Sequence, residues 1–194
     1  MLRNTTTGYG LVAIAFHWTM AILMLGMVAF GLYMTSLDQS DPSLYPLYQL
    51  HKSIGLVVLT LAVLRLAWRF VNPSPKLPEG MAPVERLAAH LGHAGLYGLI
   101  LLLPFSGWLM VSASPWGIPT YVFGLFQVPH LPVPAALGDK ATAEALLKQV
   151  HEIAAWTLLA LVAAHAAAAL KHHFIARDDT LRRMVSTAPA RADI

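Results

Sequence analysis

The sequence predicts an all-α membrane protein, a bundle of four transmembrane helices with both termini in the cytoplasm. Of its 194 residues 57% are hydrophobic and only 12% are charged, about half the ~25% of a typical soluble domain. Four long stretches carry almost no charge, and each can cross a bilayer, which takes about 20 residues. This composition argues against a soluble enzyme, a disordered chain and a nucleic-acid-binding protein.

The first two spans are predicted at residues 10–34 and 50–71. Leu11 to Met34 carries no charged side chain, and it exceeds the roughly 7–15 apolar residues of a cleavable signal peptide. The second stretch holds Arg65 and Arg69 near its far end, where long side chains can reach the headgroups. Both stretches are therefore expected to remain in the membrane.

The third and fourth spans are predicted at residues 90–113 and 150–172. No residue between Leu87 and Gly138 is charged, and the fourth stretch is rich in Ala and Leu. Prolines prevent a regular helix from continuing beyond the third span; they are Pro115, Pro119, Pro129, Pro132 and Pro134.

Basic residues set the expected orientation, because cytoplasmic loops are enriched in Lys and Arg. With both termini inside, ten of the thirteen Lys and Arg residues are cytoplasmic: Arg3, Arg65, Arg69, Lys76, Arg86, Lys171, Arg177, Arg182, Arg183 and Arg191. Only Lys52, Lys140 and Lys148 then lie outside. Residues 1–194 are interpreted as one membrane domain. It has an outer loop at 35–49, a long apolar outer segment at 114–148 and a basic cytoplasmic tail at 177–194.

Nine histidines in so apolar a chain need an explanation, because ionisable residues inside membrane spans are usually functional. His17 and His165 lie at similar depths near the cytoplasmic face, since their helices run in opposite directions. His51 and His151 open the second and fourth helices near the outer face. His151 and His165 are fourteen positions apart, a rise of ~21 Å on nearly the same helix face, so two sites could be stacked along one helix.

Imidazoles from facing helices are the usual way for such bundles to hold haem. The chain has no cysteine, which excludes disulfides, thiolate metal sites and covalently attached haem. Spacing alone leaves two alternatives open. The histidines can be hydrogen-bonded structural residues, and His93, on one face with His90, can pair with either His17 or His165.

Several motifs resemble the bacterial cytochrome b561 family of di-haem membrane cytochromes. The strongest match starts at His151 and continues past Arg182, with HE, an Ala-rich LHAAAAL-like stretch, HH and a D-T-L-x-R-M pattern at residues 179–184. The others are FHW at residues 16–18, HKSIG from His51, AHLGH at residues 89–93 and a Leu-Pro-Phe-Ser-Gly turn at residues 103–107. The resemblance covers essentially the whole chain and is weakest after the third helix.

The resemblance implies two haem b groups. His17 and His165 would ligate the iron on the cytoplasmic side, and His51 and His151 the iron near the outer face. His90 and His93 match a family motif but not the ligand positions.

Other polar residues are candidates for contacts around these groups. Lys52 on the outer side, and Arg65 and Lys171 on the inner side, are candidate partners of haem propionates, whereas Arg69 is interpreted as an anchor. His172 lies seven positions after His165 and is the candidate for a quinone site. His130, in the proline-rich outer segment, is expected to be structural.

Small members of the family resemble superoxide oxidases, which implies electron transfer from superoxide outside to ubiquinone, in the inner membrane of a bacterium. An iron with two histidine ligands has no open position, so its chemistry is outer-sphere electron transfer. The outer segment offers an anion little positive charge beyond Lys52, Lys140 and Lys148. The alternative function is a non-enzymatic cytochrome b subunit of a larger quinone-linked dehydrogenase or hydrogenase complex.

Overall fold

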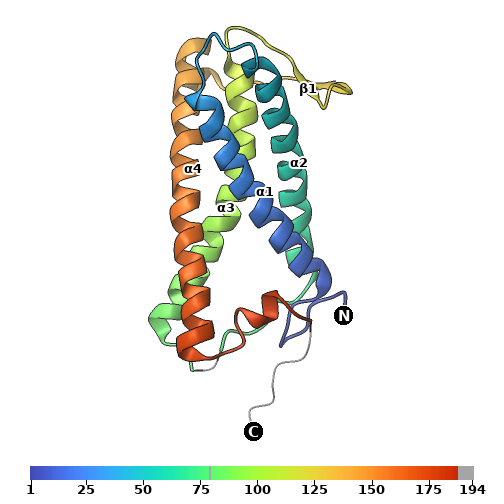
Figure 1. Ribbon diagram of the computed structural model, residues 1–194, viewed down its shortest axis with the longest axis vertical. Helices are drawn as coiled ribbons and strands as arrows, with labels where there is room; N and C mark the ends of the chain where they lie inside the picture. The colour runs from blue at the N-terminus through green and yellow to red at the C-terminus, as the bar shows by residue number, and fades with distance from the viewer. Residues whose placement is uncertain (79, 188–194) are drawn as a thin grey trace. The chain divides into compact units, whose positions relative to one another are not determined.

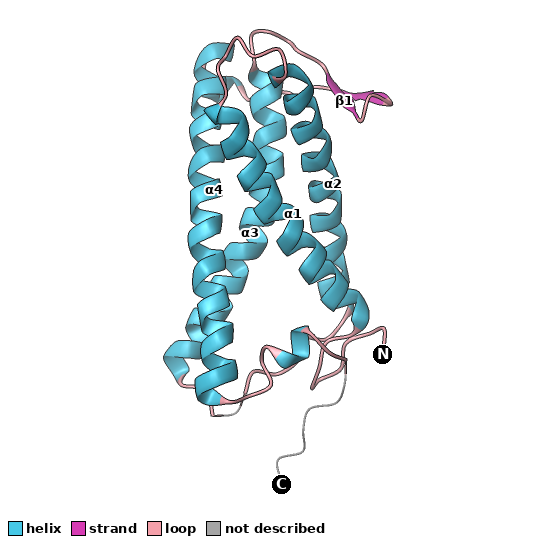
Figure 2. Ribbon diagram, in the orientation of Figure 1, coloured by secondary structure: helices cyan, strands magenta, loops and turns pink. Residues whose placement is uncertain are grey.

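Four long helices dominate the computed structural model, which describes residues 1–78 and 80–187 (Figures 1 and 2). They are α1 (Leu11–Ser36), α2 (Leu44–Val71), α3 (Pro83–Ala113) and α4 (Lys140–Lys171). A π-helical turn, η2 (His172–Ala176), continues α4, and short 3-10 turns form η1 (Ala135–Leu137) and η3 (Arg182–Met184). All four helices are long and apolar enough to cross a membrane. The predicted four-helix membrane fold is confirmed, whereas the cytoplasmic placement of the termini stays a prediction.

The chain divides into two compact units that share all four helices. Unit 1 comprises Met1–Ala21, Leu61–Gly98 and Leu158–Ile194, of which residues 79 and 188–194 are outside the described part. Unit 2 comprises Ile22–Thr60 and Leu99–Thr157. The end of the predicted cytoplasmic tail, with Arg191, also lies outside the described residues.

Few side chains on the spans are buried within the protein: only 11–17% of the most apolar window of each helix is buried. Many of the large exposed side chains on these helices are apolar, as with Ile22, Leu64 and Ile153. A bilayer is apolar on all sides of a span, so these outward side chains need no protein partner.

Three helices begin earlier than predicted. α2 starts at residue 44 instead of 50, α3 at 83 instead of 90, and α4 at 140 instead of 150. The prediction followed the apolar core of each span, but helices continue into the polar interface where their first amides find partners. Pro83 suits a first helical position, and Asp139 accepts the Thr142 amide with its Oδ1 at 2.8 Å. His51 and His151 therefore lie well inside their helices and do not open them.

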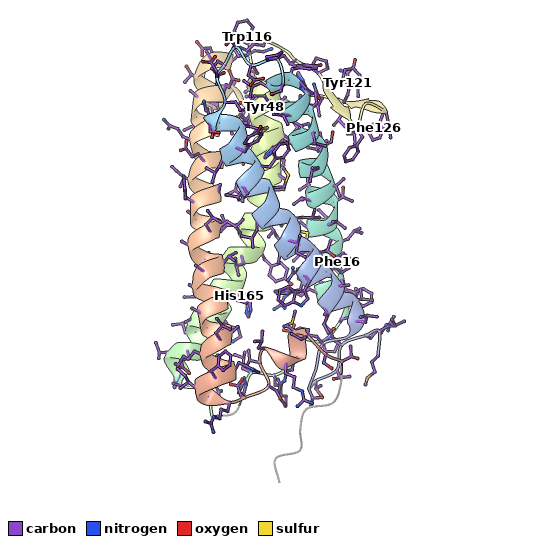
Figure 3. The ribbon with its side chains drawn as sticks, viewed as in Figure 1. Phe16, Tyr48, Trp116, Tyr121, Phe126 and His165 are labelled. Carbon is purple, nitrogen blue, oxygen red and sulfur yellow. The ribbon has the colours of Figure 1, made fainter. Side chains whose placement is uncertain are left out.

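The apolar outer segment contains a β-hairpin that the sequence did not predict. Strands β1 (Thr120–Val122) and β2 (Phe126–Val128) are antiparallel, and Val122 pairs with Phe126. Phe123 and Gly124 have φ of 49° and 73°, so the turn needs a glycine or a strained residue at both positions. The side chains of Tyr121 and Phe126 are labelled on the hairpin in Figure 3.

Side chains next to His51 hold this hairpin against α2. Gln49 Nε2 and Lys52 Nζ both donate to Pro119 O, at 2.8 and 3.1 Å. Ser53 Oγ donates to Tyr121 O at 3.1 Å and accepts from the Phe123 amide at 3.0 Å. The Tyr121 amide donates to Gln49 Oε1 at 3.1 Å. These bonds join positions about seventy residues apart, which is why local sequence pattern does not reveal them.

Candidate functional site

His17 and His165 meet within unit 1. His17 comes from α1 and His165 from α4, and their ring centroids are 6.1 Å apart with the planes inclined at 52°. Figure 3 shows His165 leaving α4 on the side that faces α1, where Phe16 is labelled. Two imidazoles bonded to one iron from opposite sides, by bonds of about 2 Å, have centroids roughly 6 Å apart. The residues therefore fit an iron held between two histidines.

His93 also lies at this site. It comes from α3, and its ring centroid is 5.4 Å from that of His165, in an edge-to-face arrangement of 68°. His165 thus has a histidine neighbour on each of two helices. The separation from His93 is shorter than two imidazoles sharing one iron require, so the distances favour His17 as the partner.

Two arginines of α2 bring positive charge to the same unit. Arg65 Nη2 lies 3.2 Å from His17 Nδ1; because a guanidinium only donates, Nδ1 is the acceptor. Arg65 and Arg69 both lie over the Tyr97 ring of α3, at 5.4 and 5.2 Å from its centroid. Within the described residues neither arginine has a carboxylate partner. Arg65 is partly buried, so its charge without a carboxylate partner favours an anionic ligand here, whereas Arg69 is exposed.

The unit 2 site contains His51 of α2 and His151 of α4, which lie within electrostatic range of each other. The His51 Nδ1 atom is buried and has no hydrogen-bond partner in the described part of the chain. Its ring packs against Phe30, with centroids 5.6 Å apart. A Cβ added at Gly31 would lie 3.6 Å from His51 Cε1. An imidazole with an orphaned nitrogen beside a glycine is suited to a ligand that completes its contacts.

Hydrogen bonding fixes the tautomer of His151. Ser106 Oγ donates its single hydrogen to Leu103 O at 2.9 Å, so at 3.1 Å from His151 Nδ1 it can only accept. His151 therefore carries its hydrogen on Nδ1 and leaves the Nε2 lone pair free for a metal. Gly107 lets the ring approach α3, because a Cβ there would lie 3.2 Å from His151 Cε1.

The lysines predicted near propionates have protein partners. Lys52 Nζ donates to Pro119 O in the hairpin anchor, and Lys171 Nζ contacts Glu85 at the start of α3. Arg65 is the predicted cation that touches a predicted ligand. His90 borders a shallow surface cavity of about 500 Å³, and His130 Nε2 lies 3.3 Å from Ile118 O within the outer segment.

His172, the candidate quinone residue, is the first residue of the π-helical turn. Its Nδ1 lies 2.6 Å from Asp178 Oδ2. The sequence reasoning missed Asp178, Ser106, Gly107 and Tyr97. For Ser106 and Gly107 a signal existed, the Leu-Pro-Phe-Ser-Gly motif, but we interpreted it as a turn; it lies inside α3, with Pro104 in the helix interior.

No cluster of three or more His, Asp or Glu side chains suited to a metal ion occurs among residues 1–78 and 80–187. A porphyrin already supplies four ligands to its iron, so two histidines are enough. Paired histidines inside a bundle of membrane helices are the arrangement found in membrane cytochromes, and this is the class of protein that the fold and the candidate sites indicate.

The chain belongs to the prokaryotic cytochrome b561 family, whose model matches residues 8–187. It is 40% identical over 182 residues to "Cytochrome b561 homolog 2" of Escherichia coli, covering 94% of this chain and 93% of the relative. It is 30% identical to "Probable superoxide oxidase CybB" of Yersinia pestis, covering 91% of this chain and 95% of the relative. "Cytochrome b562" of Cereibacter sphaeroides is also 30% identical, with 92% and 95% covered.

Family membership makes this chain a multi-pass membrane protein of electron transfer that binds haem b. It indicates oxidoreductase activity linked to quinones.

Proposed function

We propose that this protein is a di-haem b cytochrome that carries electrons across the bacterial inner membrane, from a one-electron donor at the outer face to ubiquinone. His17 and His165 ligate one iron, and His51 and His151 ligate the other. The observation that carries the proposal is that the four histidines form two pairs, each from two different helices and each within one compact unit.

Haem supplies reversible one-electron redox chemistry, and two axial histidines leave no open position for oxygen or substrate. The chain orients its ligands for that purpose. Ser106 holds His151 with Nε2 free. The buried Nδ1 of His51 has no hydrogen-bond partner in the described residues, which argues against a purely structural, hydrogen-bonded role for that ring.

Arg65 is the proposed partner of a haem propionate in unit 1. It lies at 3.2 Å from His17 Nδ1 and has no carboxylate partner in the described residues. Ligation through His17 Nε2 favours the tautomer with hydrogen on Nδ1, which cannot accept from a guanidinium. Arg65 is then free to bind a carboxylate, the group that its planar fork matches best. Lys52 and Lys171 are weaker candidates because each already donates to a protein oxygen.

His172 is the proposed contact of the ubiquinone. It follows α4 within unit 1, where the His17–His165 site also lies. An imidazole can form a hydrogen bond with the head group of a quinone and exchange a proton with it. Ubiquinone needs two electrons and two protons, and two haems can hold the two electrons delivered one at a time.

Superoxide is the proposed donor, supported by the relative named a probable superoxide oxidase. Steering of an anion depends on positive charge at the outer face, where Lys52, Lys140 and Lys148 are predicted to lie. The second candidate is an electron-transfer subunit of a quinone-linked dehydrogenase or hydrogenase complex. The exposed hairpin favours it, since Leu125 is 80% and Phe126 58% exposed, a surface suited to a larger subunit.

Haem stoichiometry tests the ligand assignment. A reduced-minus-oxidised visible spectrum with pyridine haemochrome quantitation should give two b-type haems per chain. His165→Ala should remove one haem, whereas His93→Ala, the matched control on the other side of His165, should retain both. Loss of a haem in His93→Ala with retention of both in His17→Ala would transfer the ligand role to His93.

The donor is tested with the purified protein in ubiquinone-containing vesicles. Superoxide generated enzymatically should reduce ubiquinone with release of oxygen, and the rate should fall with ionic strength if Lys52 and its neighbours steer the anion. No superoxide-dependent quinone reduction, with a large subunit co-purifying from mild detergent, would establish the subunit function instead.

A further inference from the structure

The end of α4 is built so that the chain returns to His172. The last residues form a π-helical turn, His172–Ala176. This conformation is rare in proteins, and where it occurs it is often at a functional site. Arg177 ends the turn in the left-handed region, with φ 55° and ψ 33°, and the Asp178 amide donates to His172 O at 3.1 Å. A regular helix separates positions six residues apart, whereas this turn places the Asp178 carboxylate on the His172 ring.

Both oxygens of Asp178 are engaged. Oδ2 lies 2.6 Å from His172 Nδ1, and Oδ1 accepts the Thr180 amide at 2.8 Å. Burial favours the neutral acid, but the hydrogen bonds from Thr180 and His172 outweigh it and hold the pKa of Asp178 below its ordinary value. The carboxylate is therefore ionised near neutral pH, and it can only accept.

An ionised carboxylate fixes the tautomer of the imidazole beside it. His172 must carry a hydrogen on Nδ1 to meet Asp178 Oδ2, so Nε2 is the nitrogen that exchanges a proton with a ligand. The two side chains are only 13% and 20% exposed, which limits the competition of water for this hydrogen bond.

Other charged groups around the pair are few. Glu85 of α3 interacts electrostatically with His172, but Lys171 contacts that carboxylate directly. Asp179, the next carboxylate along the chain, lies 3.8 Å from Arg182 Nη1. Asp178 is therefore the carboxylate in direct contact with His172, and its charge is the one that acts on the ring.

We propose that Asp178 is the positioning residue of a His172–Asp178 dyad that delivers a proton to the bound quinone. This inference rests on the proposed quinone role of His172. Each quinone reduced takes two electrons, through the membrane electron-transfer path, and two protons. His172 gives one of the protons from Nε2 to a carbonyl oxygen of the quinone, which becomes a hydroxyl. Water at the membrane surface supplies the second proton and restores the one that His172 gives up. The Asp178 carboxylate accepts from Nδ1 and so holds the ring with Nε2 directed away from it.

The experiment follows oxidation of the dithionite-reduced, haem-loaded protein by a short-chain ubiquinone analogue, by stopped flow at the haem absorption bands and as a function of pH. Asp178→Asn should slow the reaction about 10- to 100-fold, as loss of an orienting carboxylate typically does. It should also change the pH dependence of the rate, because the carboxylate that accepts from His172 Nδ1 is lost. Asp178→Glu, which keeps a carboxylate at this position, should restore the wild-type rate and pH dependence in part.

Asp179→Asn is the matched control, because it also removes one carboxylate charge, at the next position in the chain. That carboxylate faces Arg182 and does not contact His172. It should leave both the rate and the pH profile unchanged. Haem spectra identical in all variants show that they are folded and loaded. A wild-type rate and pH profile in Asp178→Asn overturns the dyad if His172→Ala is slow. If His172→Ala is also unchanged, the quinone role of His172 fails first, and the dyad with it.

Discussion

A methyl group added at Gly107 tests how closely α3 presses on the His151 imidazole. The new Cβ would lie 3.2 Å from His151 Cε1 and 3.5 Å from Nδ1, so the ring must move by a few tenths of an ångström. The ring is not free to do so, because Ser106 holds its Nδ1 at 3.1 Å. Overpacking of this kind typically costs about 1–3 kcal/mol.

Gly26→Ala is the matched control, since nothing lies within 4 Å of the Cβ that it adds in α1. Both substitutions bring the same helix preference of Ala over Gly, about 1 kcal/mol in soluble helices, so their difference isolates the clash. The free energy of unfolding, measured with denaturant in detergent, should be about 1–3 kcal/mol lower for Gly107→Ala than for Gly26→Ala.

If His151 ligates a haem iron as proposed, the ligand field reports the same displacement. Under that proposal, low-spin resonance of the oxidised protein should show one of two haem signals shifted in Gly107→Ala and neither in Gly26→Ala. Equal stability of the two variants together with unshifted haem signals would refute the close contact between α3 and His151.

Two further predictions concern the contact between the hairpin and α2 and the start of α4. Ser53→Ala leaves the Phe123 amide without its acceptor, at a cost of about 1–3 kcal/mol. Hydrogen exchange at that amide should therefore quicken roughly 5- to 150-fold. Thr60→Ala removes a bond within α2 alone and should not change this exchange rate; equal effects of both variants would contradict the anchoring role of Ser53. Hydrogen bonds from the Thr142 amide and side chain lower the pKa of Asp139. The Asp139 carboxylate therefore stabilises the first turn of α4 fully above the ordinary carboxyl pKa, about 4. This stabilisation is lost as the pH falls through the lowered pKa. Exchange at the Thr142 amide should show this loss in the wild type and not in Asp139→Asn; the same pH dependence in both would disprove the cap.

The four spans were predictable because a bilayer demands one property that composition reveals, a long uncharged run. The starts of α2, α3 and α4 were not predictable in this way, since Pro46 lies in the first turn of α2 and charged residues lie in the first turns of α3 and α4. The hairpin escaped prediction for another reason. Its position depends on Gln49, Lys52 and Ser53, which belong to α2 and lie far from it in sequence.

From the sequence, the depth of the candidate histidines along their helices was predictable, but not which histidine lies next to which. Antiparallel helices place His17 and His165 at one level, and the structure brings them together. Periodicity could not separate His17 from His93, because His165 does lie near both. Asp178 was out of reach, since a 3.6-residue repeat does not foresee the π-helical turn that returns it to His172.

The two sites differ in charge, and the difference bears on the direction of electron flow under the proposed function. Unit 1 places Arg65 and Arg69 over Tyr97, without a carboxylate partner in the described residues, whereas Lys52, the residue next to His51 in unit 2, donates to Pro119 O. Reduction removes one positive charge from an iron, so nearby cations favour the reduced state and raise the reduction potential. Propionates offset part of this charge at either site. The residues of the chain itself therefore make the electron more stable in unit 1, the unit that also carries His172 and Asp178, where a quinone would collect it.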